Sequence, residues 1–252
     1  MGRIFALILA LQSFAAGAAE IQVLSAGGVR PPLDELFAQF ERASGHKVAV
    51  KYVGGPTVKR EIDAGAAFDV AISNANVIDE LIKAGKLAKA TRADIARAGV
   101  GVAVRAGARK PDIASVEAFK RTLLNAKSVA YSKDGTAGTH FRGVLQRLGI
   151  SNEMEPKLKA TVAADPVGGT LVLVAKGEAE LGIAAIAAIS GPGVELAGPL
   201  PAELQAYIQF AAAVGTSARE SKAGAALIKF VTAPAAAAAY KAKGMEPAGQ
   251  RP

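Results

Sequence analysis

The sequence has no cysteine and no tryptophan, and aromatic residues make up only 5% of its 252 positions. Without cysteine there can be no disulfide, no thiol nucleophile, no thiolate metal site and no iron–sulfur cluster. Only two histidines are present, so we also expect no transition-metal site. Basic residues exceed acidic ones, with a formal net charge of +8, but no dense basic run is interleaved with aromatics. This balance favours small anions as partners, and we do not expect nucleic acid.

The common cofactor and catalytic motifs are also missing. The sequence has no G-x-x-x-x-G-K-[ST] phosphate loop, no H-E-x-x-H zinc motif and no G-x-S-x-G nucleophile elbow. The G-x-G in "GVGVAV" is not followed directly by a helix pattern, which argues against a dinucleotide site. Carboxylates are scattered without a clear acid/base pair. We therefore expect no cofactor, and the sequence leaves open whether the protein is an enzyme.

The first 19 residues have the features of a secretory signal peptide. One early cation, Arg3, precedes a short apolar run at Ile4–Leu11, and small residues follow. The run is too short to span a bilayer well, and the alternative is a buried N-terminal helix. Ala16–Ala18 forms an A-x-A pattern, so we expect cleavage near Ala18 or Ala19 and an exported mature chain.

Short apolar segments alternate with helical patterns along the rest of the chain. In the first half, strands are predicted at 21–26, 47–54, 68–73 and 99–107, with helices at 32–45, 56–65 and 76–87. In the second half, helices are predicted at 115–126, 135–150 and 169–180, and strands at 127–132, 181–186 and 206–215. This order predicts an α/β fold with mainly parallel sheets flanked by helices.

Four glycine-rich turns each follow a strand or loop and enter a predicted helix. They are "SAGGVR", "YVGGPT", "KDGTAGTHFRG" and "DPVGGT". Glycine allows the backbone to approach a ligand closely, and the N–H groups at a helix start can bind an anion. Each turn alone could be only a tight turn. Together they favour a ligand site beyond the carboxyl ends of the strands.

Side chains near these turns add candidate anion donors. Pro31 and Pro32 lack N–H groups, and Arg30 could replace them with a planar fork that suits a carboxylate. His140 lies in the first turn of a predicted helix, where the helix dipole favours its neutral form. His46 lies between a helix and a strand, and we interpret it as a surface turn residue.

The linked segments "IQVLSAGGV", "AGAAFDVAIS", "VGVAVRAGA", "SVAYSKDGTAGTHF", "AKGEAELGI" and "YKAKGMEPA" resemble the periplasmic solute-binding proteins of ABC transporters. The similarity runs from about Ile21 to about Met245 and is closest to the molybdate-binding branch. It implies a two-lobed type II periplasmic binding protein, with two crossing hinge segments and an anion between the lobes. We expect lobe I at 20–101 plus 208–252 and lobe II at 102–207. The resemblance also implies a periplasmic monomer that serves an ABC permease in the inner membrane.

The resemblance also concerns the ligand residues. Molybdate binders of this family place serines in the first two turns and a tyrosine after "LGI". This sequence has Gly28, then Pro56 and Thr57, and then Ala185 at or near those positions, whereas the Ala137–Gly138 turn matches. These departures favour an organic carboxylate over molybdate. The predicted ligand-binding residues are Gly27, Gly28, Arg30, Gly55, Thr57, Ala137, Gly138, Thr139, His140, Gly168 and Gly169.

Two other functions remain open from the sequence. A related exported isomerase of small tricarboxylic acids such as aconitate resembles the same family. In that case His140 would be the proton shuttle, with Lys59 or Tyr131 behind it. The third possibility is a ligand-sensing partner of a membrane receptor, which would differ only in its docking surface.

Overall fold

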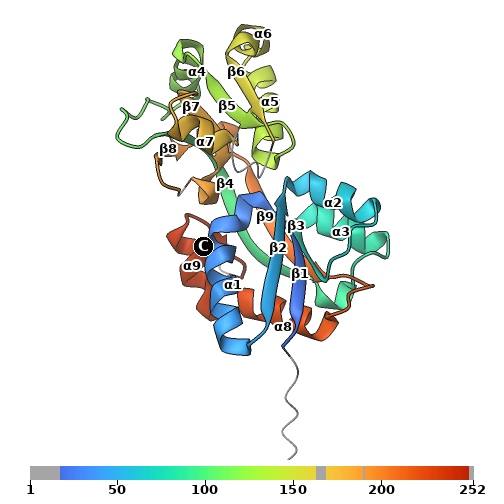
Figure 1. The fold of residues 1–252 in the computed structure, drawn as a ribbon. Helices are drawn as coiled ribbons and strands as arrows, with labels where there is room; N and C mark the ends of the chain where they lie inside the picture. Colours follow the sequence, from blue (N-terminus) through green and yellow to red (C-terminus); the bar gives the residue numbers. More distant parts are fainter. Residues whose placement is uncertain (1–17, 163–168, 190, 250–252) are drawn as a thin grey trace, which may run out of the picture.

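The computed structural model describes residues 18–162, 169–189 and 191–249, and it forms two lobes one above the other (Figure 1). The predicted signal peptide and Gly168 lie outside these residues, apart from Ala18 and Ala19. The predicted two-lobed α/β architecture is confirmed. The lobe boundaries at 101/102 and 207/208 remain predictions.

Lobe I, the lower lobe in Figure 1, contains parallel strands β1 (Glu20–Ala26), β2 (Lys47–Val53) and β3 (Val70–Asn74). Strand β9 (Tyr207–Val214) pairs antiparallel with β3. The helices of this lobe are α1 (Arg30–Ser44), α2 (Gly55–Asp63), α3 (Ala75–Lys83), α8 (Ser221–Val231) and α9 (Ala237–Ala242).

Lobe II contains strands β5 (Val129–Ser132), β6 (Leu158–Thr161), β7 (Leu181–Ala185) and β8 (Val194–Pro199). Its helices are α4 (Val116–Asn125), α5 (Thr136–Arg147), α6 (Ser151–Met154) and α7 (Thr170–Ala175). The sequence analysis missed β6 and β8, because these short strands are largely exposed and have no apolar run. Helix α7 ends well before the predicted residue 180, because Gly177 adopts a left-handed conformation with φ of 74°.

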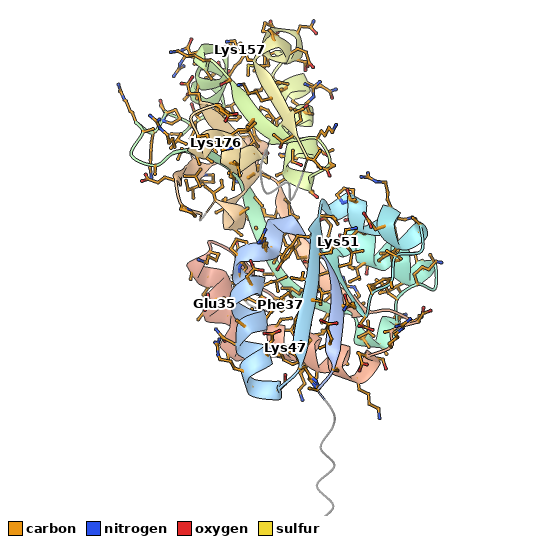
Figure 2. The ribbon with its side chains drawn as sticks, in the orientation of Figure 1. Glu35, Phe37, Lys47, Lys51, Lys157 and Lys176 are labelled. Carbon is orange, nitrogen blue, oxygen red and sulfur yellow. The ribbon has the colours of Figure 1, made fainter. Side chains whose placement is uncertain are left out.

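The lobe I sheet is covered on both faces, because successive strand residues point to opposite sides. On one face, Val23 and Ile72 pack in a cluster with α1 and α8. On the other face, Leu24 and Ala71 pack in a cluster with α2 and α3. Helix α1 is amphipathic, and Figure 2 shows buried Phe37 pointing toward the sheet and exposed Glu35 pointing away.

Helix α8 lies against α1 and buries Leu227, Ile228 and Val231. Among the described residues, no single helix has the length and apolar character of a membrane span. The bent pair Ser221–Val231 and Pro234–Ala242 meets the length and composition criteria only when taken together, with an angle of 56° between its parts.

Strand β4 (Ala93–Arg105) runs from one lobe into the other and begins six residues before the prediction. Its residues up to Gly99 pair with β9, and from Val100 onward it pairs with β7 and β8. The short strand β10 (Glu246–Pro247) also pairs with β4. All of these ladders of β4 are antiparallel. The parallel strands lie on either side of them in the sheet, in the order β2-β1-β3 in lobe I and β7-β5-β6 in lobe II.

The Gln205 side chain ties the second crossing segment to β4. Its Oε1 accepts a hydrogen bond from Val100 N at 2.8 Å, and its Nε2 donates to Val100 O at 3.0 Å. A Cβ on Gly99 would lie 3.1 Å from Gln205 Nε2, so glycine leaves room for this amide. The Gln205 amide therefore acts like one residue of a pairing strand at the point where β4 changes partners.

We expect Gln205→Leu to lower the free energy of unfolding by about 1–3 kcal/mol, because the N–H of buried Val100 loses its acceptor, whereas Val100 O keeps the hydrogen bond from Leu200 N. Urea denaturation followed by circular dichroism measures the change. Exposed Gln209, on the following strand β9, is the control, and Gln209→Leu should change stability much less. Equal losses in the two variants would contradict the role assigned to Gln205.

Candidate functional site

A pocket of about 210 Å³ lies between the two lobes, at the carboxyl ends of β1, β3 and β5. The predicted site residues that line it are Gly27, Gly28, Arg30, Gly55, Ala137, Gly138 and Gly169. Thr57, Thr139 and His140 do not line it, and Gly168 lies outside the described residues. The glycine turns therefore meet at one place, although their role in binding a ligand remains a prediction.

The polar wall of the pocket consists mainly of two helix starts. Helix α2 begins at Gly55 and helix α5 begins at Thr136, each directly after a glycine. The first N–H groups of a helix have no partner within it, so those of Gly55, Thr136, Ala137 and Gly138 are potential donors. Pro56 has no N–H, so α5 offers more donors than α2. Both helix dipoles add positive potential at the pocket.

Thr136 and Thr170, which belong to two of the predicted glycine turns, also line the pocket, and so do Asn74 and Ser132, which the sequence analysis missed. Asn74, the last residue of β3, donates from Nδ2 to Thr136 Oγ1 at 2.7 Å, whereas its buried Oδ1 has no partner among the described residues. Asn74 and Ser132 end β3 and β5, respectively. The rule that ligands bind beyond strand ends could have identified both.

The opposite wall of the pocket is apolar. Strand β7 contributes Ile183, Ala184 and Ala185, and β9 contributes Ile208 and Phe210. The close packing of this wall explains why residue 28 is glycine. A Cβ on Gly28 would lie 3.1 Å from the Phe210 ring and 3.6 Å from Ala185 Cβ. A serine at this position would need the Phe210 ring to shift.

Arg30 lies at the edge of the pocket, with its side chain 54% exposed. Its Nε binds Asp34 Oδ2 at 3.1 Å, and its guanidinium lies 5.1 Å from the centre of the Tyr52 ring. The Tyr52 hydroxyl donates to Asp34 Oδ1 at 2.6 Å, and burial, followed by this bond, raises the Tyr52 pKa above its usual value. Among the described residues the two Nη groups of Arg30 have no hydrogen-bond partner, so both can donate to a ligand.

His140 and Thr139 do not line the pocket, and both lie about a turn into α5. His140 Nε2 lies 2.7 Å from Leu204 O, and it donates to that carbonyl when this nitrogen carries a proton. Thr139 Oγ1 donates to Gly135 O at 3.1 Å within its own helix and is exposed. A residue four positions into a helix lies about 6 Å from the first along the axis, so these side chains lie behind the helix start.

The other residues that the sequence associated with the site have partners outside the pocket. Thr57 Oγ1 accepts a hydrogen bond from Arg60 Nη2 at 2.7 Å. Lys59 pairs with Asp63 on the outer face of α2. Tyr131 is buried, and its ring lies 6.1 Å from that of Phe141. The proposed proton shuttle and the residues behind it are thus separate from the pocket lining.

Gly138 sets the distance between α5 and β5. A Cβ at this position would lie 1.9 Å from Ser132 O, closer than any real contact. The helix start can therefore lie against the end of β5 only if residue 138 is glycine. This contact directs the first N–H groups of α5 into the pocket.

We expect Gly138→Ala to lower the free energy of unfolding by about 1–3 kcal/mol, because α5 must move away from β5. Gly143 in the same helix is the matched control, since a Cβ there meets nothing within 4 Å. Gly143→Ala should instead raise stability by roughly 0.5–1 kcal/mol, because alanine is the better helix former. Chemical denaturation of both variants measures the difference, and changes of the same sign would contradict the packing role of Gly138.

Comparisons with known proteins agree with this architecture. Residues 21–246 match the family of bacterial extracellular solute-binding proteins. An aconitate isomerase from a Pseudomonas species is 30% identical over 239 residues, which cover 92% of this chain and 89% of that protein. A molybdate-binding protein from Azotobacter vinelandii is 29% identical over 248 residues, covering 96% of this chain and 95% of its own.

Two solved structures share the fold. The periplasmic molybdate-binding protein of Azotobacter vinelandii superimposes with a TM-score of 0.74 at 24% identity, covering 89% of this chain and 98% of that one. The sulfate-binding protein SubI of Mycobacterium tuberculosis superimposes with a TM-score of 0.69 at 17% identity, covering 92% of this chain and 88% of that one. The chain therefore belongs to the bacterial extracellular solute-binding protein family and has the fold of the molybdate-binding-like periplasmic binding proteins.

Proposed function

We propose that the protein is a periplasmic solute-binding protein that captures a small organic carboxylate and delivers it to an ABC permease. The observation that supports this ligand class is the division of the pocket into a wall of helix starts and an apolar wall. A carboxylate group can accept hydrogen bonds from the starts of α2 and α5. Its hydrocarbon part then packs against Phe210, Ile208 and Ile183.

Arg30 supports a ligand with more than one carboxylate. Its free Nη groups lie at the edge of the pocket, and a guanidinium can bind a carboxylate through two parallel hydrogen bonds. A ligand with one carboxylate at the helix starts and another at the edge would use both sites. A bare tetrahedral oxyanion would leave the apolar wall without a partner.

Transport then requires that the ligand changes the relative position of the lobes. The change of partner between Gly99 and Val100 in β4, together with the Gln205 contact, gives two crossing segments close to each other. Closure around the ligand selects the form that the permease recognises. We propose lobes divided at 101/102 and 207/208, an exported monomer and cleavage near Ala18 or Ala19.

A thermal-shift series tests the ligand class with succinate, citrate, trans-aconitate, molybdate and sulfate. We expect a carboxylate to raise Tm with increasing concentration, with about 2.7 kcal/mol of stabilisation at a hundredfold excess over Kd. Arg30→Gln should weaken the binding of that carboxylate about tenfold, whereas Arg42→Gln on the exposed end of α1 should not. Stabilisation by molybdate or sulfate alone would contradict the proposal.

The second candidate function is isomerisation of a small tricarboxylic acid. It is favoured by the 30% identity to a protein named aconitate isomerase. Such a reaction needs a group that moves a proton. Among the described pocket-lining residues, however, Arg30 is the sole ionisable side chain. Binding without turnover is therefore the better-supported function.

Incubation with cis- and trans-aconitate separates the two functions. We expect no interconversion by chromatography, and we expect His140→Ala to change carboxylate affinity less than twofold. The physical reason is that His140 binds Leu204 O rather than the pocket. Interconversion that is abolished in His140→Ala would establish the isomerase and contradict the pure binding function.

A further inference from the structure

We propose that Asn74 is a positioning residue that holds the start of α5 beside the start of α2, and that Gly54 and Gly55 make this contact possible. The inference rests on the proposed function, because it concerns how the two lobes close on the ligand of the same pocket. It assigns to three residues of this chain the role of keeping both helix starts within reach of one ligand.

The side-chain contact joins the two lobes directly at the pocket. Asn74 ends β3 in lobe I, and Thr136 begins α5 in lobe II. Asn74 Nδ2 donates to Thr136 Oγ1 at 2.7 Å across a separation of 62 residues. Asn74 is only 8% exposed, and both residues line the pocket. The bond therefore fixes the distance between the two lobes where a ligand would lie.

The backbone contact beside this bond leaves no room for a side chain. A Cβ on Gly54 would lie 2.3 Å from Asp134 O, which belongs to the loop before α5. A Cβ on Gly55 would lie 2.6 Å from Asn74 Oδ1 and 3.1 Å from Thr136 Oγ1. A side chain at position 54 would therefore hold the lobes apart, whereas one at position 55 would first displace Asn74 of its own lobe.

The conformation of Gly54 shows that its own backbone does not require glycine. Its φ is −62° and its ψ is 144°, an extended conformation that any residue adopts. Alanine at this position is thus compatible with lobe I by itself and conflicts only with Asp134 of lobe II. Gly54→Ala can therefore test the closure of the lobes without changing the folding of lobe I.

The contact does not close the pocket by itself. In the structure, where the two lobes are in contact, Asn74 Oδ1 is buried and has no hydrogen-bond partner among the described residues. A buried acceptor without a donor opposes closure. The bridge then positions the helix starts, while the ligand supplies the free energy that keeps the lobes together.

The decisive variant is Gly54→Ala, with Gly143→Ala on α5 as the matched control. Because the chain has no cysteine, spin labels can be placed on introduced cysteines at exposed Lys83 and Gln146, one in each lobe. Interlobe distances are measured by pulsed electron paramagnetic resonance with and without citrate or trans-aconitate. Affinities are measured by calorimetry on the unlabelled proteins.

We expect the wild-type protein and Gly143→Ala to show a shorter interlobe distance with the carboxylate. Gly54→Ala should keep the longer distance, bind at least tenfold more weakly, and unfold at the same or a higher temperature without ligand. A lower Tm together with weaker binding would mean that Gly54 serves the fold and would overturn the inference. Closure and affinity equal to wild type would overturn it too.

A double-mutant cycle tests the side-chain bridge. Asn74→Ala and Thr136→Val should each weaken carboxylate binding about fivefold, and together they should cost little more than either alone. Thr136→Ser keeps the hydroxyl and should keep wild-type affinity. Losses of affinity that add fully in the double mutant would show that the two side chains are not coupled and would overturn the proposed bridge.

The two proposals fail in different ways. If the wild-type protein responds to neither carboxylate, the proposed function fails, and the inference that rests on it fails as well. If the wild-type protein binds and closes while Gly54→Ala does the same, only the inference fails.

Discussion

The pocket depends on backbone contacts that tolerate no side chain. Gly138 lets α5 lie against Ser132 O, Gly54 lets the start of α2 lie against Asp134 O, and Gly28 leaves space for the Phe210 ring. None of these glycines has a positive φ, so their own conformations do not require glycine. What requires it is the close approach of another segment. The helix starts can therefore point into one small volume from both lobes.

The two lobes face each other because they share one long strand. Strand β4 pairs with β9 in lobe I and with β7 and β8 in lobe II, and the change falls between Gly99 and Val100. The Gln205 amide occupies both backbone polar groups of Val100 at this point. The closure proposed above would change the distance between α2 and α5 at this point. The same connection holds the two walls of the pocket next to each other.

The pocket offers positive potential with little formal charge. Helix starts supply oriented N–H groups that are already in place and pay no side-chain entropy when a ligand binds. Arg30 adds one guanidinium at the edge, where Asp34 and Tyr52 hold it. A cation buried in the pocket would have to be desolvated, which costs free energy, and its charge would exclude only other cations. In the proposed function, the apolar wall would favour an organic anion over an inorganic one of similar charge.

The order of most strands and helices and the positions of the glycine turns could be predicted from the amino-acid sequence. Local periodicity and glycine placement report local conformation, so Gly27, Gly55 and Gly169 were predicted at the pocket from the pattern, whereas Ala137 was assigned there from the family resemblance. The edge strands β6 and β8 were missed, because their pairing depends on neighbours and not on their own apolar content.

Which side chains line the pocket depended on the tertiary structure. It placed His140 against Leu204 O, and it joined Asn74 to Thr136 across 62 residues. It also brought Phe210 from the second crossing segment to Gly28. The physical reason is that a side chain's partner is set by packing between segments far apart in the chain, whereas a sequence pattern records only the conformation of each segment.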